Sequence, residues 1–335
     1  MPTRDSAPTT TPNTAGAPSD LSGPPLVTGA TGFAGSHLID ELLTSEPEVA
    51  AWAHRGGSPD PHSTDARVGW AAVDLLDREE VRRALAETRP SVIYHCAGIA
   101  HVGESWNAAE RALRVNALGT HHVLEGVRSE GLACAVLVTG SALVYRPSTM
   151  PLCEDDPIGP VDPYGVSKLA QEMIALRARH APVFVVRPFN HAGPRQGPSY
   201  STSSFARQVA AIEAGRSAPV LRVGNLKSRR DVTDVRDTVR AYVAIVQRGR
   251  PARPYNVCSG TAYRLRDLLD ALVGLSRVPI SIEVDPARLR ASDNPVIAGD
   301  RSRITSETGW VPRLTIEQTL GDLLDYWRGA IIQAS

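Results

Sequence analysis

The stretch Leu26–Leu43, LVTGATGFAGSHLIDELL, decides the fold of this chain. A short apolar strand runs directly into glycines spaced as Gly29-x-x-Gly32-x-x-Gly35, and a helical pattern follows at once. Glycine at these positions allows a tight turn, close approach of a pyrophosphate and packing of the helix on the strand. The free N–H groups at the start of the helix then attract phosphate. The residues expected to contact a dinucleotide here are Gly29, Thr31, Gly32, Phe33, Ala34 and Gly35.

Strands and helices alternate after this turn. This pattern, with apolar β-branched strands, predicts an α/β fold with a Rossmann-type doubly wound parallel sheet. Beyond Arg187 the pattern is looser and predicts a smaller mixed α/β C-terminal substrate lobe. We expect a disordered tail over 1–24, a dinucleotide-binding domain over 25–187 and the lobe over 188–330, with the segment 232–260 packing back on the sheet. The expected strands are Leu26–Thr28, Val49–His54, Gly69–Val73, Val92–Cys96, Ala135–Thr139 and Val183–Arg187, and the expected helices of this half are Gly35–Leu43, Arg78–Glu87, Ala108–Ser129 and Pro163–Arg179.

Composition excludes several classes of function. The 335 residues carry no formal net charge, which gives no general attraction to nucleic acid or to an anionic membrane. No apolar run is long enough for a membrane helix, and the first residues lack the apolar core of a signal peptide. The cysteines are far apart and lack metal-binding spacing, so no metal site is expected. We therefore expect a cytoplasmic protein.

The end of the second expected strand, AWAHRGG, bears on the choice of cofactor. An acid there would bind the ribose 2′-hydroxyl of NAD, but His54 and Arg55 occupy the position. A cation suits the 2′-phosphate of NADP, so NADP(H) is the preferred cofactor and NAD(H) a possible one. The alternative is that Arg55 is a solvated loop charge. After the third strand, Asp74 and Leu75 are expected beside the adenine; the alternative is a helix N-cap aspartate, which fits Asp77 better than Asp74.

A proton-transfer group is indicated by DPYGVSKLAQE and VTGSALVYR. Tyr164 and Lys168 lie one turn apart on a helix, so their side chains share a face. The Lys168 ammonium is expected to lower the pKa of the Tyr164 phenol, ordinarily about 10, and to contact the nicotinamide ribose. Ser141, just past a buried strand, is expected to hydrogen-bond the substrate oxygen.

With TGxxGxxG, a serine before Val-Tyr and YxxxK, the chain resembles the extended short-chain dehydrogenase/reductase family. Within it, VRPFNHAGPRQ, VGNLKSRRDVTDVRDTVRAY and TGWVP are similar to the branch of GDP-4-keto-6-deoxy-D-mannose reductases and GDP-mannose 4,6-dehydratases. The resemblance extends from Leu26 to Trp327. It implies cofactor contacts for Ala97, Gly98, Asn116, Pro188 and His191, besides Tyr164 and Lys168.

The resemblance also implies a substrate site and an assembly. Asn190 matches a residue that contacts the nucleotide-sugar diphosphate, and Arg230 and Arg290 match arginines that bind it. Arg288 rivals Arg290, and the less favoured alternative for Arg230 is an ion pair with Asp231 or Asp234. Many relatives form homodimers through the two long helices Ala108–Ser129 and Pro163–Arg179.

The turn after Ser141 indicates the reaction, because it has no acidic residue. Dehydratase relatives carry an acid after the catalytic hydroxyl, whereas Ala142 and Leu143 stand here. This favours NADPH-dependent reduction of the 4-keto group of a GDP- or dTDP-linked 4-keto-6-deoxyhexose, with the proton from Tyr164. A 4-epimerase, a 4,6-dehydratase and a non-catalytic NADP(H)-binding regulator are the alternatives. Arg146, where relatives often have glycine, is a candidate for altered sugar selectivity.

Overall fold

The computed structural model describes residues 23–55, 64–99, 108–288 and 294–333. Its main sheet has seven strands, all parallel, in the order β10-β6-β5-β4-β1-β2-β3. The order reverses between β1 and β4, which is where open α/β sheets bind their ligands. The predicted Rossmann-type sheet is therefore confirmed. The strands are β1 (Leu26–Thr28), β2 (Val49–Ala53), β3 (Val68–Ala72), β4 (Val92–His95), β5 (Ala135–Thr139), β6 (Val183–Pro188) and β10 (Pro254–Val257).

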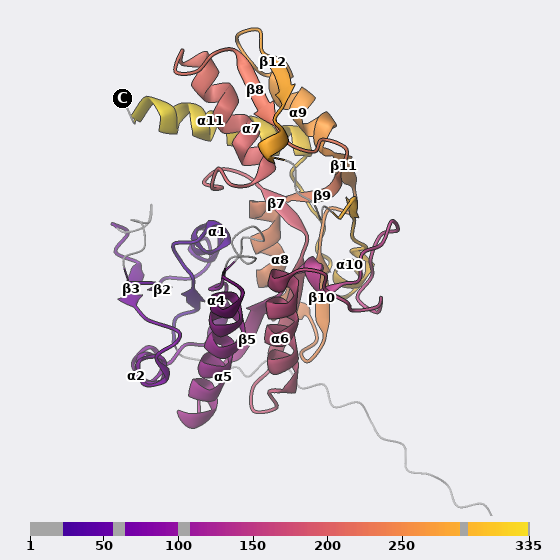
Figure 1. The fold of residues 1–335 in the computed structure, drawn as a ribbon. Coiled ribbons are helices and arrows are strands. Elements are labelled where there is room, and N and C mark those ends of the chain that lie inside the picture. The colour runs from indigo at the N-terminus through magenta and orange to yellow at the C-terminus, as the bar shows by residue number, and fades with distance from the viewer. Residues whose placement is uncertain (1–22, 56–63, 100–107, 289–293, 334–335) are drawn as a thin grey trace, which may run out of the picture.

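Helices cover both faces of this sheet, as Figure 1 shows. Successive strand residues point to opposite faces, so Val27 packs in one core and Leu26 in the other. The first core lies under α1 and α8, and the second lies under α2, α5 and α6. These helices are α1 (Phe33–Leu42), α8 (Val235–Arg248), α2 (Arg78–Thr88), α5 (Gly119–Ser129) and α6 (Pro163–Arg177).

The helix expected over Ala108–Ser129 is interrupted. A short α4 (Ala109–Leu113) leads into a π-helical turn, η1 (Arg114–Leu118), before α5 continues. Such turns are rare and occur often at functional sites. Asn116 lies in the π turn, fully buried, where its side chain bonds Ile99 and Ser167. The π turn thus fixes a contact between this helix, α6 and the segment after β4.

The C-terminal lobe has its own core. Phe205, Leu221, Leu269 and Leu324 belong to this core, which is separate from the two cores of the main sheet. Strands β7, β9, β11 and β13 form one small sheet, and β8 and β12 pair in another. The lobe elements are β7 (Asn190–Ala192), α7 (Ser201–Glu213), β8 (Val220–Val223), β9 (Arg229–Asp234), β11 (Ala262–Arg264), α9 (Leu265–Gly274), β12 (Ser281–Val284), β13 (Val296–Ile297) and α11 (Ile316–Gln333).

The chain crosses between the two halves more than once. After β9, α8 returns to pack on α1, and β10 joins the edge of the main sheet beside β6. A further helix, α10 (Ser302–Thr308), packs on α8 and β10 before α11 returns to the lobe. In the described ranges no helix has the length and apolar character needed to cross a membrane.

Candidate active site

A cavity of about 1150 Å³ opens at the carboxyl ends of the strands and reaches into the C-terminal lobe. It brings together most of the residues selected from the sequence, although they come from distant parts of the chain. Residues that line it are Gly29, Thr31, Gly32, Phe33, Ala34, Gly35, Asp74, Leu75, Ala97, Gly98, Ser141, Tyr164, Lys168, Pro188, Asn190, His191 and Arg230. Asn116 and Arg55 are not among the lining residues.

The glycine turn fits a pyrophosphate. Gly29 has φ +66°, and a Cβ on it would lie 2.6 Å from the Ala97 Cα. A Cβ on Gly35 would lie 2.2 Å from the Gly29 carbonyl oxygen, so α1 can pack this closely only with glycine there. Helix α1 has no side-chain cap and no acid in its first turn. Its N–H groups and positive dipole end are thus available to an anion in the cavity.

At the adenosine end, the two predicted contacts differ. Asp74 lines the cavity, where its Oδ1 accepts a hydrogen bond of 2.9 Å from the Leu76 N–H. Arg55 lies beside it in the fold but donates to Glu80 Oε1 at 2.7 Å, with 68% of its side chain exposed. A cofactor phosphate would have to compete with Glu80 for this guanidinium. The role of Arg55 toward NADP(H) stays a prediction.

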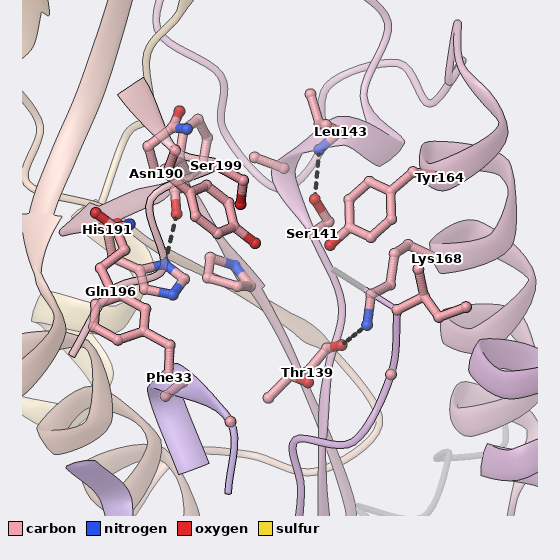
Figure 2. Close-up of a pocket in the computed structure, with 18 of the residues that line it drawn as sticks. Phe33, Thr139, Ser141, Leu143, Tyr164, Lys168, Asn190, His191, Gln196 and Ser199 are labelled. Atoms are coloured by element: carbon pink, nitrogen blue, oxygen red, sulfur yellow. Dashed lines mark hydrogen bonds between the residues drawn. The ribbon is translucent and has the colours of Figure 1, made fainter. Parts of the chain in front are cut away.

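Ser141, Tyr164 and Lys168 lie together on one wall of the cavity (Figure 2). Ser141 caps the 3₁₀ turn η2 (Ala142–Val144), with its Oγ accepting from the Leu143 N–H at 3.1 Å. The Lys168 Nζ lies 6.0 Å from the centre of the Tyr164 ring and donates to the Thr139 carbonyl at 2.8 Å. Gly98 permits this arrangement, because a Cβ on it would lie 2.6 Å from Asn116 Oδ1 and 3.3 Å from the Lys168 Nζ.

Burial acts on the two titrating groups in opposite directions. It lowers the pKa of Lys168 to about 8 because the ammonium loses hydration. It raises the pKa of Tyr164 above its usual range, although a hydrogen bond from Ser141 opposes the rise. The expectation that Lys168 lowers the pKa of Tyr164 is wrong for this structure, since desolvation of the phenolate dominates. The phenol is therefore protonated at neutral pH.

The opposite wall carries the expected substrate groups. Asn190 and His191 of β7 face the cavity, and the His191 ring stacks on Phe33 with centroids 5.5 Å apart (Figure 2). Arg230 lines the cavity and donates to the Arg229 carbonyl at 2.8 Å. Arg290 lies outside the described residues, whereas its rival Arg288 lines the cavity.

Sequence reasoning missed several lining residues. Arg222 of β8 adds a third guanidinium beside Arg230 and Arg288, and Tyr200 lies close enough to Tyr164 to raise its pKa. Arg222 stands in the alternating pattern of a strand, which gave no reason to single it out. Tyr200 precedes α7 in a segment rich in serine, and no spacing relates it to Tyr164.

The serine turn is free of acid. Ala142 and Leu143 both line the cavity. The carboxylates among the described lining residues are Asp74, at the adenosine end, and Asp162, which caps α6 by accepting from the Gly165 N–H at 2.8 Å. Neither directly follows Ser141. The arrangement therefore suits proton donation to a carbonyl oxygen.

A Rossmann sheet with a serine, tyrosine and lysine at its carboxyl edge defines a nicotinamide-dependent enzyme of the extended short-chain dehydrogenase/reductase class. Residues 26–323 match the family model described as GDP-mannose 4,6 dehydratase, and the chain belongs to this family.

Named relatives of the chain carry out more than one reaction. GDP-6-deoxy-D-mannose reductase of Pseudomonas aeruginosa is 34% identical over 91% of this chain and 97% of the relative. UDP-glucose 4-epimerase of Mycolicibacterium smegmatis is 30% identical over 90% of this chain and 98% of its own length. The solved structure of RMD from Pseudomonas aeruginosa complexed with NADPH superposes with a TM-score of 0.81 at 32% identity, covering 92% of this chain and all of that one (100%).

Proposed function

We propose that the protein is an NADPH-dependent reductase of the 4-keto group of a nucleotide-linked 4-keto-6-deoxyhexose. The observation that carries the proposal is that Ser141, Tyr164 and Lys168 line one cavity beside a turn, Ala142–Leu143, without an acid. A reductase needs a proton donor at this place, whereas a dehydratase needs an additional acid–base pair. The reductase among the named relatives and the NADPH in the related structure support the same reading.

The chain's own residues account for the proton. When bound, NADPH supplies a hydride to C4 of the sugar. The Ser141 and Tyr164 hydroxyls donate hydrogen bonds to the C4 oxygen, and the Tyr164 proton moves to that oxygen as the carbonyl becomes an alcohol. The Lys168 ammonium stabilises the phenolate that remains. Solvent then returns a proton to Tyr164.

The groups proposed to hold the substrate lie on the lobe side. Arg230 and Arg288 carry fixed positive charge and can bind a diphosphate through paired N–H groups. Asn190 offers a neutral donor at the edge of the same region. Both GDP and dTDP satisfy these contacts, so the base is left open between them.

The test is reduction of GDP- and dTDP-4-keto-6-deoxyhexoses in the presence of NADPH, followed by loss of NADPH absorbance and by NMR of the product. Tyr164→Phe is expected to lower kcat by about 10³-fold while NADPH still binds, because only the proton donor is removed. Full activity of this variant, or no oxidation of NADPH with any of these sugars, would refute the proposal.

A 4-epimerase is the second candidate, because a relative of nearly equal identity is a UDP-glucose 4-epimerase. It would accumulate the 4-epimer of a nucleotide sugar with no net consumption of NADPH. The same assay distinguishes the two reactions. A protein that binds NADPH without either reaction would instead be the non-catalytic regulator.

A homodimer is proposed through the helices α4, η1 and α6. Large apolar side chains project to solvent from this surface: Leu113 is 40% exposed, Leu118 38%, Val166 45% and Met173 49%. Covering these side chains with a second copy would remove apolar area from water. Val166→Glu with Met173→Glu is expected to give a monomer by light scattering. Cytoplasmic location stays a prediction from the sequence.

A further inference from the structure

The Lys168 ammonium has a second partner besides the Thr139 carbonyl. It donates to Oε1 of Gln171 at 2.8 Å, and both side chains are buried. An ammonium has three N–H donors, so these two bonds leave one for groups in the cavity. Gln171 is not a lining residue, and of its two side-chain partners, Lys168 and Thr120, Lys168 is the one that lines the cavity. It therefore reaches the active site only through Lys168.

The number of hydrogens that each group can donate fixes the direction of the hydrogen bonds that link Gln171 to Thr120. The Thr120 hydroxyl donates its only hydrogen to the Asn116 carbonyl at 2.7 Å. Thr120 Oγ1 must then accept at its remaining contacts, of which one is Gln171 Nε2 at 2.8 Å. The amide nitrogen of Gln171 faces Thr120, and the amide oxygen faces Lys168. A flipped amide would set N–H groups against the ammonium.

The chain of bonds continues to the sheet. His95 Nε2 lies 2.9 Å from Thr120 Oγ1 and must be the donor there. Burial lowers the pKa of His95 to about 3, so the ring is neutral and its Nδ1 accepts from the Thr28 hydroxyl at 2.8 Å. Thr28 Oγ1 in turn accepts from the Ala97 N–H at 3.3 Å. The chain thus ends at backbone that itself lines the cavity.

We propose that Gln171 is a positioning residue that holds the Lys168 ammonium beside Tyr164, with Thr120, His95 and Thr28 as its anchor in the sheet. Every polar group in this buried chain has one partner arrangement, so the amide oxygen cannot turn away from Lys168. Such fully satisfied networks restrict a core to one geometry. The inference rests on the proposed function only for the reason that Lys168 needs positioning.

The proposal has an electrostatic consequence that opposite substitutions can test. Groups facing Lys168 are the neutral His95 from β4, the Cys96 thiol just after β4, and the protonated Tyr164 from α6. Gln171 supplies an acceptor without charge. Gln171→Met keeps the volume but removes the acceptor, which disfavours the ammonium and lowers the pKa of Lys168. Gln171→Glu adds a carboxylate at the same place and raises it.

The small number of lysines in the sequence allows the pKa of Lys168 to be measured directly. Lys168 and Lys227 are the chain's two lysines, so protein labelled with ¹⁵N-lysine gives two side-chain signals. Lys227 is exposed and serves as the internal reference, assigned with Lys227→Arg. Following both signals against pH in the full chain, we expect the Lys168 midpoint near 8 to fall by about one unit in Gln171→Met and to rise by a similar amount in Gln171→Glu.

The inference is overturned if the Lys168 midpoint is the same in the unmodified protein and in both variants. Thr120→Val provides an independent variant, should a substitution at Gln171 prevent folding. It releases the far end of the amide and is expected to lower the midpoint by less than Gln171→Met, and an unchanged midpoint counts against the anchor. The readout needs no substrate. The expected shifts without any reduction of a keto sugar would refute the proposed function and leave this inference standing.

Discussion

The two halves of the cavity that we assign to the cofactor and to the substrate differ in the groups that they offer to an anion. In the proposed cofactor half these groups are backbone N–H groups at the start of α1, where Gly29 and Gly35 leave no space for a Cβ. In the substrate half they are guanidinium groups on Arg222, Arg230 and Arg288. One half fixes its donors through the fold, and the other half supplies them on long side chains.

This difference indicates which half of the cavity tolerates substitutions. Backbone donors cannot be altered without moving the strand and the helix that hold them, so the cofactor half changes only at its edges. Guanidinium groups can be removed one at a time, because each lies on its own element. Substitutions in the substrate half can therefore change ligand binding while the sheet remains the same.

Among substitutions of the anion-facing groups, the largest effect is expected from Gly35→Ala. Its Cβ would lie 2.2 Å from the Gly29 oxygen, so α1 must move away from the turn. We expect NADPH binding to weaken by about 100-fold, equivalent to about 3 kcal/mol. Fluorescence of bound NADPH measures this. Gly69→Ala is the matched control, since nothing lies within 4 Å of a Cβ there. Equal affinities of the two variants would contradict the assigned role of the turn.

Arg230→Ala should have the next largest effect, confined to the substrate half. Loss of one charge-assisted contact to a diphosphate is expected to raise KM for the nucleotide sugar by about 30-fold and to leave NADPH affinity unchanged. Steady-state kinetics with each ligand varied in turn separates the two. Arg229→Ala is the control, because Arg229 bonds the Ala262 carbonyl and does not line the cavity. A similar rise in KM in both variants would mean that the overall positive charge, and not a contact of Arg230 with the diphosphate, causes the effect.

Residues that act through spacing could be predicted from the sequence. The spacing of the glycines after a strand predicts the phosphate-binding turn. The separation of Tyr164 and Lys168 on a helix predicts that their side chains lie together. Ser141 followed from the end of a buried strand. In each case local structure alone fixes the relative positions, and the confirmed parallel sheet brings these segments to one edge.

Residues that act through burial or through a distant partner could not be predicted from the sequence. The pKa of Tyr164 depends on how much water the folded cavity excludes, and the opposite sign was expected. Gln171 meets Thr120 only because α6 packs beside α5, across 51 positions of sequence. The engagement of Arg55 with Glu80 arises in the same way, since a helix carries Glu80 to the end of the second strand.

A moderate effect is expected from Arg55→Ala, at the outer edge of the cofactor half. If Arg55 binds the 2′-phosphate, KM for NADPH should rise by about 10-fold while KM for NADH stays the same. Glu80→Gln removes the competing carboxylate, 2.7 Å away, and should lower KM for NADPH by a few fold. Opposite directions in the two variants would establish the contact. Equal changes for NADPH and NADH would refute it.

The smallest effect is expected from Arg146→Gly, which tests whether the substrate half extends to the serine turn. Arg146 lines the cavity just after η2, and its Nε lies 3.5 Å from the position of a Cβ on Gly159. Because this guanidinium is exposed, its contribution to binding should be modest, and we expect KM for the nucleotide sugar to change about threefold with kcat unchanged. Arg146→Lys keeps the charge and is the control. If Arg146 contacts the sugar, the ratio of KM values for two 4-keto sugars on the same nucleotide will differ between Arg146→Gly and the unmodified protein. An unchanged ratio would confine substrate selection to the arginines of the lobe.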